Sequence, residues 1–180
     1  MRIAPLTPGD LPRYKALMLH AYDAAADAFT STAAERAAEP DAWWLKRIAD
    51  PTGLSQAFGA FDGDNGDDLV GTVTVEFSAK PKTRHKALVI GMFVHASARH
   101  RGAGRALLQA ALDAARARPG VFVVTLTVTE GNGAAVSLYE SCGFRAFGVE
   151  PMAIATPAGY LGKVHMVLQL APQPAGGPPG

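Results

Sequence analysis

An apolar run that breaks into a glycine- and arginine-rich turn, and then resumes at helical spacing, constrains this chain more than any other feature. The run covers residues 87–94, the turn reads Arg-His-Arg-Gly-Ala-Gly over 99–104, and the helical pattern follows over 105–112. A strand that turns sharply into a helix exposes the first backbone N–H groups of that helix, which have no intrahelical acceptor. Together with the helix dipole, these donors form a binding site for a phosphate or pyrophosphate.

The residue types in the turn favour the same interpretation. Gly102 and Gly104 would let the backbone approach such a ligand closely, and Arg99 and Arg101 add positive charge. The formal net charge of the whole chain is only +1, so anion binding has to be local. The near-neutral balance therefore favours neither nucleic acid nor a membrane surface as a partner.

Length and composition indicate one compact domain. The chain has 180 residues, 48% of them apolar, and its single cysteine, Cys142, excludes an internal disulfide and a cysteine metal cluster. The N-terminus lacks the pattern of a signal peptide, and no apolar segment approaches the roughly 20 residues that span a bilayer. We therefore expect a cytoplasmic protein with one domain over 1–170, and a disordered Pro/Gly-rich tail over 171–180.

The periodicity of apolar residues predicts an α/β (α+β) fold with a mixed sheet flanked by helices. Capping residues at 7–10 open a first helix, and the pattern over 24–39 leaves helix and loop both open. Further helices are expected at 41–50, 102–118 and 133–142, and strands at 55–61, 69–77, up to 94, 121–128, from 143, and 159–170. The acidic turn 62–68 lacks the glutamate and the flanking helices of a calcium loop, so no metal site is expected.

Two separated motifs resemble those of the GNAT superfamily of acyl-CoA-dependent N-acetyltransferases. The first has the family form Val-x-Pro-x-x-Arg-x-x-Gly-x-Gly, with Ala96 in place of the proline; its matching residues are Val94, Arg99, Gly102 and Gly104. The second has the form Asn-x-x-Ala-x-x-Leu-Tyr-x-x-x-Gly-Phe; its matching residues are Asn132, Ala135, Leu138, Tyr139, Gly143 and Phe144. The motifs occur in the family's order and span about a third of the chain, residues 87–144.

This resemblance implies a mostly antiparallel central sheet of about six to seven strands with one splayed parallel pair. It implies acetyl-CoA as cosubstrate, no metal, and direct attack of a primary amine in a ternary complex. The acceptor, a small molecule or a protein amine, is not readable from the sequence, nor is the use of other acyl groups. An edge strand near the C-terminus is compatible with a homodimer.

The resemblance also implies roles for individual residues. Backbone N–H groups of the turn would bind the pyrophosphate of coenzyme A, strand residues before it would pair with the pantetheine arm, and Asn132 would bond near the cofactor amides. The expected cofactor-binding residues are Met92, Phe93, Val94, Arg99, His100, Arg101, Gly102, Ala103, Gly104, Arg105, Asn132 and Tyr139. Tyr139 would also be the general acid, since a phenol of pKa about 10 stays protonated at neutral pH.

The general base is less defined. Many family members carry a glutamate in the strand that leads into the first motif, and here residues 87–91 contain no acid. Glu76, on the neighbouring strand, is the first candidate, followed by His85 and Glu130, with a water relay open for each.

Other interpretations of the same residues stay open at the level of sequence. The glycines could serve only a tight turn, Asn132 only as a helix N-cap, and Tyr139 only in packing. A noncatalytic CoA-binding regulator would keep the turn without the acid. A dinucleotide-binding oxidoreductase would need a glycine or alanine where Leu107 stands.

Overall fold

The computed structural model describes residues 1–63 and 67–170, so the expected disordered tail lies outside the described residues. The strands are β1 (Arg2–Pro5), β2 (Ser55–Asp62), β3 (Asp68–Phe77), β4 (Lys86–Val94), β5 (Val123–Thr129), β6 (Arg145–Thr156) and β7 (Gly159–Gln169). The α-helices are α1 (Leu11–Ala24), α2 (Ala33–Ala37), α3 (Asp41–Ile48), α4 (Ala103–Ala117) and α5 (Gly133–Ser141). Three 3₁₀ turns complete the described chain: η1 (Pro8–Asp10), η2 (Ala26–Ala28) and η3 (Ala96–Ala98).

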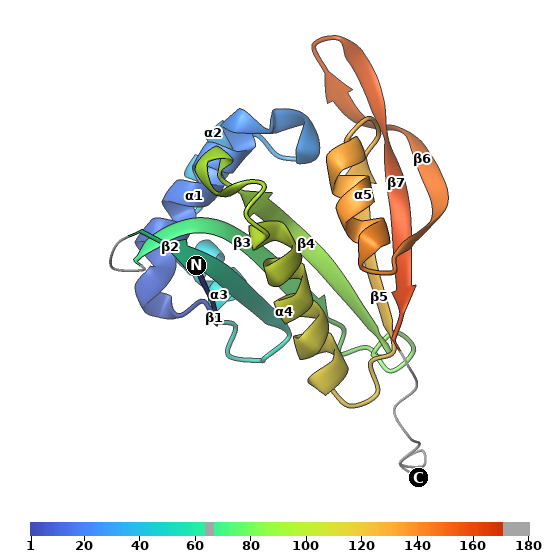
Figure 1. The fold of residues 1–180 in the computed structure, drawn as a ribbon, viewed down its shortest axis with the longest axis horizontal. Helices are drawn as coiled ribbons and strands as arrows, with labels where there is room; N and C mark the ends of the chain where they lie inside the picture. Colours follow the sequence, from blue (N-terminus) through green and yellow to red (C-terminus); the bar gives the residue numbers. More distant parts are fainter. Residues whose placement is uncertain (64–66, 171–180) are drawn as a thin grey trace.

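One seven-stranded sheet, in the order β1-β2-β3-β4-β5-β7-β6, runs through the molecule. Its strand pairs are antiparallel except β4 and β5, which are parallel. The predicted mixed, mostly antiparallel sheet with a single parallel pair is therefore confirmed. Figure 1 shows α4 and α5 in front of this sheet, and α1 and α3 behind its β2–β3 part.

Two apolar clusters fill the two faces of the sheet. The cluster under α4 and α5 takes Val73 and Val75 from β3, and helix α4 presents a continuous apolar stripe to it: Leu107, Leu108, Ala111, Leu112 and Ala115. The second cluster lies under α1 and α3 and includes Tyr14, Trp44 and Phe93. Because side chains alternate along a strand, the residues of β3 next to these valines, Thr72, Thr74 and Glu76, face α1 and α3.

Most predicted elements are present with small shifts at their ends. The capping residues at 7–10 form η1, in which Asp10 Oδ2 accepts hydrogen bonds from the backbone N–H and the hydroxyl of Thr7, and α1 follows directly. The undecided segment 24–39 contains η2 and the short helix α2. Strand β1 was not predicted, since a four-residue strand that ends in a proline carries little periodicity; it pairs with β2 at the edge of the sheet.

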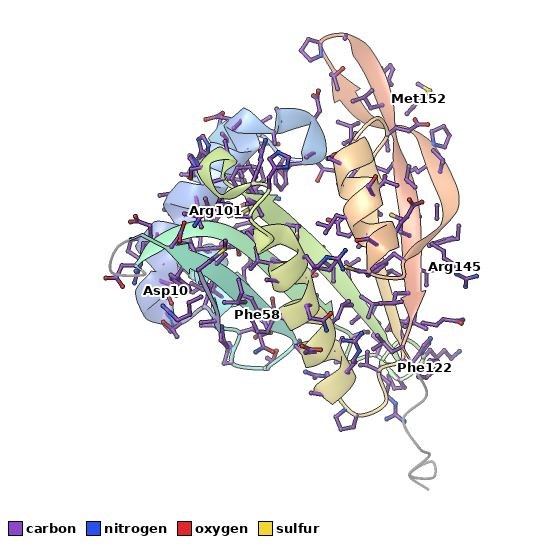
Figure 2. All side chains as sticks on the ribbon, viewed as in Figure 1. Asp10, Phe58, Arg101, Phe122, Arg145 and Met152 are labelled. Atoms are coloured by element: carbon purple, nitrogen blue, oxygen red, sulfur yellow. The ribbon has the colours of Figure 1, made fainter. Side chains whose placement is uncertain are left out.

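The other edge strand, β6, is largely open to solvent. Its apolar side chains include Phe147, 63% exposed, and Met152, 67% exposed, and Figure 2 shows Met152 on the outer side of β6. The expected homodimer along this edge stays a prediction. Among the described residues, no helix combines the length and the apolar character that crossing a membrane requires.

Candidate active site

The parallel pair β4–β5 holds together only at one end. Lys86, Ala87 and Leu88 pair with Val123, Val124 and Thr125, and no pairing between the two strands is present beyond these residues. Strand β5 continues alongside β7 instead, and Figure 1 shows β4 and β5 diverging from their lower ends. The part of β4 from 89 to 94 therefore has one side of its backbone without a strand partner, as an added extended ligand would require.

A β-bulge lies in the part of β4 that has no partner on its β5 side. Thr72 pairs with Phe93 and Thr74 with Ile90, so Gly91 and Met92 together oppose one residue of β3. Gly91 has a φ of +60°, a left-handed conformation that glycine adopts without strain. The extra residue reverses the alternation, so that Met92 packs toward α4 while Phe93 packs toward α1.

The turn after β4 leaves a set of backbone N–H groups free. Within the described residues, none of the amides from His100 to Arg105 donates a hydrogen bond. Gly102, the N-cap of α4, has a φ of +82°, and a Cβ added there would meet no atom within 4 Å. The 15-residue helix α4 adds the positive end of its dipole at the same place. These amides are available to an anion at the place where the sequence predicts an anion site, and anion binding there stays a prediction.

The arginine side chains of the turn bond to the protein itself. Arg99 Nε donates to the carbonyl oxygen of Val94 at 3.1 Å, and Arg105 donates to Ser141 Oγ at 2.8 Å. Arg101 forms an ion pair with Asp62 at the end of β2, and this hydrogen-bonded guanidinium lowers the pKa of Asp62. Figure 2 shows Arg101 beside the start of α4. The guanidinium groups thus hold the loop in shape as well as supplying charge.

Gly104 marks the point where three elements meet. A Cβ added there would lie 3.2 Å from Leu138 Cδ2 of α5, 3.6 Å from Met92 Cε and 3.9 Å from Val94 Cγ2 of β4. The free amides, the bulged strand and helix α5 are therefore adjacent. A side chain at position 104 would project between them.

Helix α5 contributes Tyr139 and Asn132. Tyr139 is buried, its ring lies 5.9 Å from that of Phe144, and burial raises the pKa of its phenol to about 12. Its hydroxyl makes no hydrogen bond to a described residue, yet it is not among the buried side-chain atoms that lack a partner, so it keeps contact with solvent. Asn132 caps α5 by accepting from the N–H of Ala135 at 3.2 Å, and its amide NH2 donates to no residue that the structure describes.

The three candidate bases lie in different surroundings. Glu76 is half-buried and lines a hollow of about 470 Å³ together with Lys46, so it lies on the α3 face of the sheet. His85 stacks on Phe122 at the paired end of β4 and β5, about 20 Å along β4 from the bulge. Glu130 Oε2 accepts from the N–H of Gly162 at 3.1 Å, a contact within the β5–β7 region.

Sequence reasoning missed two groups that lie on the Glu76 face. Thr74 is 1% exposed, and its Oγ1 would lie 3.9 Å from a Cβ added at Gly91. Burial raises the pKa of Tyr14 of α1 to about 12, and the hydroxyl of Thr74 acts on this phenol in the opposite direction. The glycine inside an apolar strand pattern is a signal for the bulge, whereas nothing in the sequence brings residue 14 to residue 74.

The connection between α1 and α2 crosses toward the far side of the splay. Thr129 Oγ1, at the end of β5, donates to the carbonyl oxygen of Asp27 in η2 at 2.7 Å. Figure 1 shows this connection close to α5 at the top of the molecule. The α1–α2 connection therefore contacts the end of β5 at the open end of the splay.

A search of known proteins returned matches that fit this geometry. Residues 18–144 match the model of the acetyltransferase (GNAT) family. The L-amino acid N-acetyltransferase AaaT of Escherichia coli is 30% identical over 108 residues, which are 60% of this chain and 64% of that protein. The chain thus matches somewhat less than two thirds of that relative's length.

Solved structures with the same fold cover nearly the whole chain. A GCN5-related N-acetyltransferase from Kribbella flavida has a TM-score of 0.78 and 28% identity, covering 94% of this chain and 97% of its own. The putative acetyltransferase yncA from Salmonella typhimurium, determined with its cofactor acetyl-CoA, has a TM-score of 0.77 and 23% identity, covering 97% and 96%. From the family match over most of its length, together with the splayed sheet and the motif residues at the splay, the chain belongs to the GNAT family of acetyltransferases.

Proposed function

We propose that this protein transfers the acetyl group of acetyl-CoA directly to a primary amine bound in the same complex. The observation that carries the proposal is the adjacency of the free amides at 100–105, the stretch of β4 without a partner on its β5 side, and helix α5, which carries Tyr139. The residues present fit the cosubstrate: the amides suit its diphosphate, and the strand edge suits its extended pantetheine arm. The acetyl group would then lie at the bulge.

The chemistry at the bulge needs three contributions from the protein. A neutral amine attacks the thioester carbonyl, the oxygen gains negative charge, and the sulfur leaves with a proton. A backbone N–H of the strand at 92–94 would stabilise the oxygen, since β4 has an unpaired side there. Holding amine and thioester together supplies much of the rate, because oriented reactants avoid the entropy cost of meeting in solution.

Tyr139 would protonate the leaving sulfur. Its pKa of about 12 keeps the phenol protonated at every physiological pH. A thiol has a pKa of about 8.5, so a phenol this weak gives up its proton only as charge develops on the sulfur. Its early contribution is therefore a hydrogen bond to the sulfur, and complete transfer comes as the carbon–sulfur bond breaks.

Glu76 remains our proposed base, acting through water. It stands two residues from Thr74 on one face of β3, so its backbone lies about 7 Å from the residue that faces the bulge. That separation calls for at least one water between the carboxylate and the amine. The position of His85 and the backbone contact of Glu130 make these two residues weaker candidates.

Release of free thiol from acetyl-CoA in the presence of an amine panel tests the proposal. The E. coli relative acts on L-amino acids by its name, which is a reason to include free amino acids in that panel. Amine-dependent thiol release with mass-spectrometric detection of the acetylated amine supports transfer. Thermal stabilisation by acetyl-CoA without thiol release for any amine would point to a noncatalytic CoA-binding protein, and stabilisation by NAD instead would point to an oxidoreductase.

A further inference from the structure

Arg47 is half-buried, and its guanidinium has no hydrogen-bond acceptor among the described residues. It lies in the last turn of α3. Of the half-buried arginines in the described chain, Arg36 bonds to Ser31 and Glu39, and Arg118 bonds to the carbonyl oxygen of Gly53. The guanidinium of Arg47 has no hydrogen-bond acceptor among the described residues and no carboxylate within 4.0 Å. A partly desolvated charge without a counter-ion is costly unless a ligand pairs with it.

The guanidinium is nonetheless held in a fixed position. Its central carbon lies 4.1 Å from the centre of the Trp43 ring, and the guanidinium carbon of Arg36 lies 4.4 Å from the same ring. Trp43 in turn meets Trp44 edge-on, with ring centroids 5.0 Å apart, and Trp44 is fully buried. Stacking on an anchored indole restrains the planar fork of Arg47 before any ligand arrives.

Arg47 also lies on the side of the sheet that carries the proposed base. Its charge lowers the pKa of Tyr14 against the effect of burial, and the charge of Glu76 acts on the same phenol. Ser55 Oγ of β2 donates to the carbonyl oxygen of Arg47 at 3.3 Å, and Ser55 pairs with Glu76 of β3. Two residues from Glu76, Thr74 faces Gly91 of the bulge. The neighbouring Lys46 lines the same hollow as Glu76. Arg47, Glu76 and the bulge therefore lie along the face opposite α4.

We propose that Arg47 binds a carboxylate of the acceptor, so that the preferred acceptors are free amino acids rather than simple amines. This rests on the proposed acetyl transfer, and it names the substrate class of that site. The planar fork of an arginine matches the two oxygens of a carboxylate, and Arg47 offers all its donors. The carboxylate would supply the counter-ion that the described chain does not provide, while the amine of the same molecule points toward the bulge.

The test compares amino acids with their carboxamides, which differ only in the charged group. Two sets are needed, α-amino acids and ω-amino acids of increasing length, because the length of the best acceptor reports the separation between Arg47 and the acetyl group. For each acceptor, kcat/KM is measured for the wild type and for Arg47→Met. Comparing the two enzymes on one acceptor cancels the difference in amine basicity.

Arg36→Met is the matched control, because it removes the other guanidinium from the same indole. We expect Arg47→Met to lower kcat/KM for the amino acids by about 10- to 100-fold, the usual effect of losing a charged hydrogen-bond pair, and to leave the carboxamides nearly unchanged. Arg36→Met should keep the preference for amino acids. Circular dichroism and acetyl-CoA binding of both variants show that the fold and the cosubstrate site are intact.

Several results would overturn the assignment to Arg47. A wild type that acetylates carboxamides or simple amines as efficiently as amino acids has no carboxylate site. Equal losses of kcat/KM for an amino acid and its carboxamide in Arg47→Met would show a structural role for Arg47. Loss of the preference for amino acids in Arg36→Met alone would assign the carboxylate site to Arg36. Acetyl-CoA binding without thiol release for any amine would instead contradict the proposed transfer itself.

Discussion

The two faces of the sheet at the β4–β5 splay use different parts of the chain. On the face of α4 and α5, the candidate cosubstrate site is made of backbone: free amides over 100–105 and the open edge of β4. On the opposite face, the candidate acceptor site is made of side chains, among them Tyr14, Arg47 and Glu76. A backbone site depends on conformation and space, whereas a side-chain site depends on individual groups. Substitutions on the two faces should therefore fail in different ways.

The sharpest test of the backbone face is Gly104→Val. The new side chain would project toward Leu138, Met92 and Val94, into the gap that the pantetheine arm needs. We expect acetyl-CoA binding to fall more than 100-fold by isothermal titration calorimetry, since the ligand and the side chain compete for one space. Gly148→Val is the control, because a Cβ there meets nothing within 4 Å. Full binding by a folded Gly104→Val protein would refute the assigned path of the cosubstrate.

Tyr139→Phe tests the proposed general acid, the one side chain on the face of α4 and α5 to which we assign a role in the reaction. It should lower kcat about 10²-fold, within the usual range for positioned proton transfer, and leave the Kd for acetyl-CoA nearly unchanged. Because the pKa of Tyr139 is about 12, wild-type activity should show no loss from ionisation of this phenol between pH 7 and pH 10. An unchanged kcat in steady-state assays of the variant would reduce Tyr139 to a packing residue.

Glu76→Gln should act on the acceptor face and depend on pH. The amide cannot take a proton from the amine, so we expect kcat to fall about 10- to 100-fold near neutral pH. The deficit should shrink as the pH approaches the pKa of the acceptor amine, because the amine then arrives neutral. Glu130→Gln serves as the control, since that carboxylate bonds to the N–H of Gly162. A deficit that is constant from pH 7 to pH 9.5 argues against a role as base.

Asp62→Asn should have the smallest effect, because it leaves both sites intact and removes only a support of the turn. Arg101 would lose its ion partner, so we expect the Kd for acetyl-CoA to rise several-fold with kcat unchanged. The lowered pKa keeps Asp62 charged at every pH above the ordinary aspartate value of 3.8. The difference from the wild type should therefore persist at neutral pH and disappear only below that value. Equal affinities at pH 7 would show that the turn holds its shape without this ion pair.

The same contrast explains how far the sequence could be interpreted. The glycines at 102 and 104 act within one turn, and Asn132 caps the helix that follows it directly, so these local patterns predicted the turn and the two helices. The parallel pair was predicted from the family resemblance. Strand β1 was not predicted because it is short and two of its four residues are exposed. The acceptor face combines residues from 14 to 76 that meet only through packing of α1 and α3 on the sheet. No local sequence pattern predicts that residues so far apart in the chain lie together.

The central claim is that the backbone amides at the start of α4 hold the diphosphate of coenzyme A. Amide NMR resonances followed during titration test it directly, with coenzyme A compared against 4′-phosphopantetheine, which lacks the diphosphate. We predict that the resonances of residues 100–105 shift strongly with coenzyme A and weakly with 4′-phosphopantetheine, while those of residues 89–94 respond to both. Coenzyme A that binds and leaves the 100–105 amides unmoved would contradict the account.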